Sequence, residues 1–395
     1  MDKKPILALL PISLLVISIS FFIIEEAKTR NNIYYITFLA PTIFLFVKYK
    51  SFSILKENKE LLLFFLLSVI STIISGNHPV DNIKHALYLC ALLVGLHTCH
   101  EEQTLFDKAL FSYPVIVVFF FSIAAYHWTE KYLASGSFKR ITLYAAAANP
   151  VHASLMILVG WVGFWLFWAI PKYKGHKEFL FYIMTGGALF ICLVFQSRSA
   201  LVGVFIALST WIILNKEKKI GLIAVAFLSA GALTTGLHEA FLNRGSSYRL
   251  DIWQNALSNI DGIEWLIGTA ERKEHLYLGK FYHEHSAYLS ILIKNGLLGL
   301  IPFIVFSVNY IKQGIRTRSN WFILSLIGWG ALITTSNGLI DSLRPLWIYF
   351  WIPTFLALID YSRPTGAQTE RDNALCAKNK GSASPGQRFS PEALP

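Results

Sequence analysis

Long uninterrupted apolar runs constrain this chain more than any other feature of its sequence. Residues 5–24, 151–170 and 220–237 are apolar on every face, and a helix needs roughly 20 such residues to cross a bilayer. A membrane β-barrel would instead show short segments of alternating polarity. Because a lipid-facing backbone must satisfy its own hydrogen bonds, helices are the spanning elements that fit. The sequence therefore predicts an all-α polytopic membrane protein.

Composition excludes a soluble globular enzyme. Only 15% of the residues are charged and 54% are hydrophobic, whereas soluble domains carry about 25% charged residues. The net charge of +11 is typical of basic cytoplasmic loops in a membrane protein, so no nucleic-acid partner is expected. The four cysteines form no CxxC pair and no cluster with histidine, so we expect neither a disulfide framework nor a zinc site.

We expect about twelve transmembrane helices, because each consumes roughly 20 residues and the connections look short. The predicted spans are 5–24, 33–47, 61–75, 83–99, 109–126, 151–170, 179–195, 200–214, 220–237, 296–311, 321–338 and 345–360. Alternate connections are rich in lysine and arginine, which the positive-inside rule assigns to the cytoplasm. Both termini then lie in the cytoplasm, and the other connections lie outside.

The chain divides into four predicted regions. Residues 1–237 hold the first nine spans, and residues 238–285 form one large outer loop in which short helices are expected. Leu250, Trp253, Ala256 and Leu257 fall at helical spacing there. Residues 286–360 hold the last three spans, and residues 361–395 read as a disordered cytoplasmic tail.

Three arginines stand out near the outer interface. Arg198 interrupts two apolar runs, where a charge is costly; it either snorkels, pairs with a carboxylate or binds a substrate, and we favour the last. Arg244 and Arg249 lie in the large outer loop, and guanidinium groups suit two-pronged contacts with phosphate oxygens. The alternative for Arg249 is a surface pair with Asp251 or Trp253. For Arg244 alone a solvated surface charge is the more common outcome.

Other polar residues mark the points where the chain re-enters the membrane. His285 follows His283 and Glu284, and an imidazole can accept a proton from a hydroxyl near neutral pH. The alternative is that this histidine at a helix end only fills space at the membrane interface. A metal site is not expected, because the sequence has no second pair of ligands at helical spacing. Asp341 and Arg344 either pair across one helical turn or contribute to an acceptor site.

Four glycines read as close-packing positions between helices. They are Gly186, Gly187, Gly296 and Gly299.

Three of these segments, in this order, resemble the O-antigen ligase family of the bacterial inner membrane. Residues 197–200 are similar to its Ser-Arg signature between two spans, and Arg249 with Trp253 is similar to its Arg-x-x-x-Trp element in the large periplasmic loop. The third is His-Ser-Ala-Tyr-Leu at 285–289, followed by Gly-Leu-Leu-Gly at 296–299. The family usually reads His-Asn-x-x-Leu, so Ser286 replaces an asparagine.

The resemblance implies transfer of a glycan from undecaprenyl pyrophosphate to a sugar hydroxyl of lipid A core, at the periplasmic face and among membrane lipids. Neither a metal nor a nucleotide cofactor is implied. Arg198 and Arg249 would bind the diphosphate, and His285 would orient or deprotonate the acceptor with inversion of configuration. Further substrate-binding candidates are Arg244, Trp253, Asp341 and Arg344.

Two alternatives remain. An O-antigen polymerase uses the same donor, but polymerases commonly carry Arg-x10-Gly patterns, and no glycine stands at the eleventh position after Arg244, Arg249 or Arg272. A transporter or flippase also fits twelve helices. Transporters usually place polar residues near the bilayer midplane, whereas the candidates here cluster at the outer face, so we favour a ligase.

Overall fold

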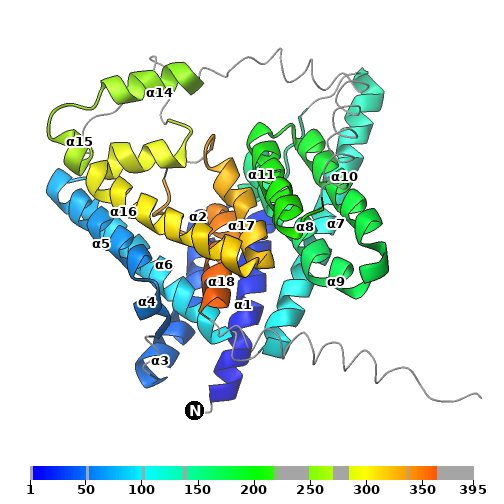
Figure 1. The fold of residues 1–395 in the computed structure, drawn as a ribbon, viewed down its shortest axis with the longest axis horizontal. Coiled ribbons are helices and arrows are strands. Elements are labelled where there is room, and N and C mark those ends of the chain that lie inside the picture. Colours follow the sequence, from blue (N-terminus) through cyan, green and yellow to red (C-terminus); the bar gives the residue numbers. More distant parts are fainter. Residues whose placement is uncertain are drawn as a thin grey trace, which may run out of the picture.

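The computed structural model describes residues 3–49, 53–99, 103–136, 140–217, 219, 249–269, 284–335 and 338–362. Across these ranges the regular structure is helical, and no strand occurs. The predicted all-α class is therefore confirmed for the described part of the chain. The helices form a bundle in which α14 lies at the end opposite the N-terminus (Figure 1). We call this the α14 end.

The first half of the bundle contains four long helices, α1, α5, α6 and α7, and several shorter ones. In chain order they are α1 (Lys3–Ile23), α2 (Ala27–Tyr34), the π-helical η1 (Tyr35–Leu39), α3 (Ala40–Tyr49), α4 (Ser53–Glu57), α5 (Lys59–Ser75), α6 (Pro79–Cys99) and α7 (Gln103–Ser135). The elements α2, η1 and α3 run on without a break, since the backbone stays helical through each junction.

The second half continues through one interrupted region. It contains η3 (Ala145–Ala148), α8 (Pro150–Phe164), η4 (Trp165–Ala169), α9 (Ile170–Lys172), η5 (Lys174–His176), α10 (Lys177–Phe195), α11 (Arg198–Asn215), α14 (Arg249–Ser258), α15 (Glu264–Ile267), α16 (Ala287–Thr317), α17 (Asn320–Ala331), η6 (Trp347–Trp351) and α18 (Ile352–Tyr361). The short helices expected in the large loop correspond to α14 and α15.

Six described helices are long and apolar enough to cross a membrane. They are Ile6–Ile23, Thr104–Ser135, Pro150–Lys172, Lys177–Phe195, Arg198–Asn215 and Ala287–Thr317. Each predicted span within the described residues falls on a helix, while the predicted span 220–237 lies outside them. The count of about twelve spans stays a prediction.

Several predicted boundaries were wrong. Helix α16 begins at Ala287, whereas the predicted span begins at 296, where the helix is broken at Gly296. Helix α7 extends to Ser135, beyond the predicted end at 126, because its last turns are polar and do not register as an apolar run. Helix α17 ends early, at Ala331, and the Thr334 hydroxyl that follows donates to the Ser199 hydroxyl at 2.9 Å.

Glycines and aromatic rings pack the middle of the bundle. A Cβ at Gly203 of α11 would collide with the Ile327 carbonyl oxygen of α17, so the two backbones touch, as is common between membrane helices. Beside this contact, the Trp329 ring stacks on Tyr310 with ring centroids 5.2 Å apart. Close backbone contact and stacked rings together fix α17 in the core of the bundle.

The predicted close-packing role is confirmed for two glycines near the α14 end. Gly296 has φ +58°, and a Cβ there would collide with the Leu266 carbonyl of α15. A Cβ at Gly299 would lie 3.2 Å from the Ser68 hydroxyl of α5. The prediction is also confirmed for Gly187, where a Cβ would collide with the Trp161 ring of α8. For Gly186 it was wrong, because nothing lies within 4 Å of a Cβ there.

Candidate functional site

Arg198 is placed by the cap of α11. Gln196 adopts a left-handed conformation with φ +46° and ends α10. The Ser197 hydroxyl then accepts a hydrogen bond from the Ala200 amide at 3.3 Å and caps α11, which is a preferred task of serine. The chain thus reverses direction within two residues, and Arg198 becomes the first residue of α11, partly buried at the α14 end.

Arg249 lies close enough to Arg198 for the two charges to repel. The pKa of the Arg249 guanidinium is lowered by burial and, less strongly, by the positive charge of Arg198. Both side chains are partly buried. Two neighbouring guanidinium groups at a partly desolvated site favour a bound anion. Arg249 is also the first residue of α14, and the starts of helices carry partial positive charge.

Trp253 ties α14 to the residue before His285. Its indole N–H donates to the Glu284 carbonyl oxygen at 2.8 Å. On the adjacent face of α14, Ile252 and Ala256 are buried against Ile293 of α16. Trp253 therefore has a structural hydrogen bond in addition to the substrate contact predicted from the sequence, which stays a prediction.

His285 occupies an unusual backbone conformation directly before α16. Its φ is +53°, a region that residues other than glycine seldom adopt. Next to it, the Ser286 hydroxyl accepts a hydrogen bond from the Leu289 amide at 3.4 Å and caps the helix. Asparagine caps helices about as well as serine, so the family's usual asparagine and Ser286 can perform the same task.

Glu284 is a buried acid beside this histidine. Its residue is 3% exposed, and its Oε1 atom has no hydrogen-bond partner among the described residues. Buried polar atoms are nearly always paired, so an unpaired carboxylate oxygen next to His285 marks a place where a donor group of a ligand would be stabilised.

Three hydrogen bonds link the motifs in series, and the proximity of Arg249 to Arg198 closes that series into a ring. Thr334 bonds to Ser199 beside Arg198, and the Ala287 amide, just after His285, donates to the Leu332 carbonyl at 3.0 Å. Trp253 reaches back from α14 to Glu284. We call this set of contacts the motif ring. It brings Arg198, Arg249 and His285 to the α14 end although they lie far apart in the sequence.

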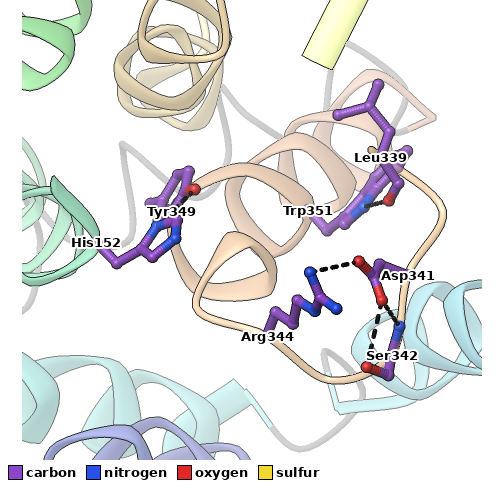
Figure 2. A network of polar contacts seen from close by, with 7 residues as sticks. All are labelled: His152, Leu339, Asp341, Ser342, Arg344, Tyr349 and Trp351. Atoms are coloured by element: carbon purple, nitrogen blue, oxygen red, sulfur yellow. Dashed lines mark hydrogen bonds and ion pairs between the residues drawn. The ribbon is translucent and has the colours of Figure 1, made fainter. Parts of the chain in front are cut away.

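Asp341 and Arg344 pair as predicted, with Arg344 Nη1 2.9 Å from Asp341 Oδ2. Figure 2 shows the pair in the irregular segment before η6, where the Ser342 amide also donates to Asp341 Oδ1 at 2.7 Å. The prediction of a helical turn between them was wrong, because these residues form a bend. A hydrogen bond from the Trp351 indole to the Leu339 carbonyl, at 2.9 Å, anchors the segment.

Two of the sequence-based predictions reach beyond what the structure describes. Arg244 lies outside the described residues, as does His283. Within the described ranges, no group of three His, Cys, Asp or Glu side chains is arranged to hold a metal ion.

A polar cavity of about 220 Å³ lies beside the start of α16. It is enclosed by α5, the first turns of α6, α16 and the segment at 338–341, and its polar lining residues are Thr72, Asn77, His78, Asp81, Asn82, His85, Ser290, Lys294, Asn295 and Asp341. We call it the α6–α16 cavity. Of these residues the sequence analysis proposed only Asp341.

A signal for the missed residues was present in the sequence. His78, Asp81, Asn82 and His85 recur at three- and four-residue spacing, which places them on one face of a helix. Lys294 stands within an otherwise apolar segment near the predicted outer side, where the positive-inside rule disfavours lysine. Both patterns indicate a polar site.

Comparison with known proteins agrees with the order of the motifs. Residues 181–304, which contain Arg198, Arg249 and His285, match the O-antigen ligase family model. A protein of Pseudomonas aeruginosa named O-antigen ligase is 23% identical to this chain, over 93% of this chain and 94% of that protein. No solved structure matches the chain. These matches agree with the resemblance predicted from the three motifs: the chain is similar to the O-antigen ligase family, over residues 181–304 in the family model and over most of its length in the Pseudomonas protein.

Proposed function

We propose that this chain transfers a glycan from undecaprenyl pyrophosphate to a sugar hydroxyl of lipid A core, at the periplasmic face of the bacterial inner membrane. The observation that carries the proposal is the motif ring, which gathers two arginines and one histidine from three separate helix starts. The similarity to the O-antigen ligase family independently supports glycan transfer.

Arg198 and Arg249 would hold the diphosphate of the donor. Burial and, less strongly, repulsion from Arg198 lower the pKa of Arg249, and an anion with several oxygens would relieve that repulsion. Two-pronged guanidinium contacts suit such oxygens better than a lysine ammonium does. As the glycan leaves, negative charge grows on the diphosphate, and donors already in place stabilise that charge without reorganising.

His285 would accept the proton of the acceptor hydroxyl. The hydroxyl oxygen forms a bond to the anomeric carbon while the bond from that carbon to the diphosphate oxygen breaks. The proton passes to the imidazole, and undecaprenyl pyrophosphate leaves with the bonding electrons. One displacement of this kind inverts the configuration at the anomeric carbon.

The test is the lipopolysaccharide banding of a strain that lacks the protein. Loss of polymer from lipid A, with carrier-linked polymer retained, supports ligation. Loss of polymer with capping by single units retained would show polymerisation instead and overturn the proposal. Plasmid-borne wild-type protein serves as the control, since it should restore the original pattern.

The topology that the proposal requires can be tested separately. Reporter fusions after Lys216 and Arg316 should report the cytoplasm, and one at Asp261, which precedes α15, should report the periplasm. A cytoplasmic signal at Asp261 would place the motif ring on the wrong side of the membrane for a periplasmic donor.

A further inference from the structure

The α6–α16 cavity has a different chemistry from the arginine pair. Its carboxylates already have basic neighbours, because Asp341 pairs with Arg344 at 2.9 Å and Asp81 lies 3.8 Å from Lys84. Lys294 adds one positive charge to the lining, beside two histidines. A lining of mixed charge suits a neutral ligand with many hydroxyl groups better than a diphosphate, which requires clustered cations.

The amide side chains in the cavity are held in fixed orientations. The Asn77 amide nitrogen donates to the Thr269 carbonyl at 3.2 Å, and that of Asn295 donates to the Ser68 carbonyl at 3.2 Å. The Asn82 amide nitrogen is likewise engaged, donating to the Asn77 carbonyl at 3.0 Å. These bonds orient the side chains, and Asn77 and Asn295 each keep an amide oxygen and a second amide hydrogen that can bond to a sugar hydroxyl.

The size and position of the cavity narrow the choice of ligand further. Its volume of about 220 Å³ corresponds to about seven water molecules at roughly 30 Å³ each, which suits one sugar ring and not a long glycan. Ser290 and Lys294 line it within the first two turns of α16, about 10 Å along the helix from its start. Ser290 is five residues beyond His285, so the cavity lies near the start of the helix that His285 precedes.

We propose that the α6–α16 cavity is the acceptor subsite, which binds one neutral sugar residue of the acceptor and presents its hydroxyl to His285. This assignment rests on the proposed ligase function. It also separates the two substrates physically, with the diphosphate at the arginines and the acceptor sugar between α6 and α16.

Gly338 offers a way to fill the cavity without changing its charge. It lines the cavity, and the nearest described atom to a Cβ built there is Lys294 Nζ at 3.5 Å, an ordinary contact. Gly338→Leu should therefore fold and occupy the space of the sugar. The matched control is Gly186→Leu, because nothing lies within 4 Å of a Cβ at Gly186 in α10. Lys294→Met is a second variant, which keeps the apolar stem and removes the ammonium group.

The experiment measures initial rates with purified full-length protein, a lipid-linked glycan donor and purified lipid A core, varying one substrate at a time. Gly338→Leu and Lys294→Met should raise the KM for lipid A core about tenfold or more, which corresponds to the loss of one or two hydrogen bonds. The KM for the donor should stay unchanged, and Gly186→Leu should match wild type.

The possible results distinguish the two proposals. A rise in the donor KM alone would place donor sugars in the cavity and overturn the acceptor assignment. If wild type ligates and neither KM changes in either variant, the cavity is not a substrate site, while the ligase function stands. If wild type extends lipid-linked glycan and transfers nothing to lipid A core, the proposed ligase function is wrong. The acceptor assignment, which rests on that function, is then wrong as well.

Discussion

Replacing Trp253 with phenylalanine tests whether the motif ring positions the site. The change keeps an aromatic ring on α14 and removes the N–H that donates to the Glu284 carbonyl at 2.8 Å. Glu284 is 3% exposed, so its carbonyl loses a partner that water cannot readily replace. Leaving a buried acceptor unpaired costs about 1–3 kcal/mol. That cost corresponds to about a 5- to 150-fold shift away from the docked position of α14.

The assay combines steady-state ligation with hydrogen exchange. We expect Trp253→Phe to lower kcat/KM for the donor within that range and to speed amide exchange in α14, while protein abundance stays normal. Trp265→Phe is the matched control, because Trp265 of α15 is 40% exposed. Wild-type activity and exchange in Trp253→Phe would refute the positioning role. Lost activity with unchanged exchange would favour a direct substrate contact instead.

Three further predictions concern the motif residues themselves. Arg198→Lys and Arg249→Lys should each lose most ligation at matched protein abundance, because lysine lacks the two-pronged donor geometry; near-normal polymer on lipid A in both strains would show that charge alone suffices. His285→Ala should reduce transfer by about 10²- to 10⁴-fold, whereas His283→Ala should be mild, and purified variants showing the reverse order would overturn the assignment. Gly296→Ala should lower the thermal unfolding temperature, because strain at positive φ costs about 1–3 kcal/mol and the new Cβ meets the Leu266 carbonyl; an unchanged unfolding temperature would contradict the backbone contact.

Much of the fold could be predicted because its signals are local. Apolar runs identify membrane helices without any knowledge of their neighbours. Helix ends were harder, as α16 shows: Lys294 and Asn295 interrupt the apolar sequence just before the break at Gly296, and the predicted span began only at that break. After the early end of α17, Thr334 makes a hydrogen bond to Ser199, a long-range contact that the sequence alone does not show.

The candidate site was only partly accessible to sequence reasoning, for a related reason. Arg198, Arg249 and His285 belong to recognisable short motifs, so each could be proposed singly. The role of Trp253 as a donor to the Glu284 carbonyl required the tertiary structure. The α6–α16 cavity required it even more, since its lining comes from four separate segments. The spacing of His78 and His85 showed a polar helix face but not what it faced.

The break at Gly296 has a consequence for how this helix tolerates change. In a regular helix, one inserted residue turns everything beyond it by about 100°. Gly296 has non-helical angles, φ +58° and ψ −161°, and the backbone of α15 rests on it. The rotational register of residues 287–295 is therefore set by α15 rather than by residues 297–317. An insertion or deletion after Gly296 would therefore rotate only the side chains of residues 297–317. Ser290 and Lys294 would keep their orientation.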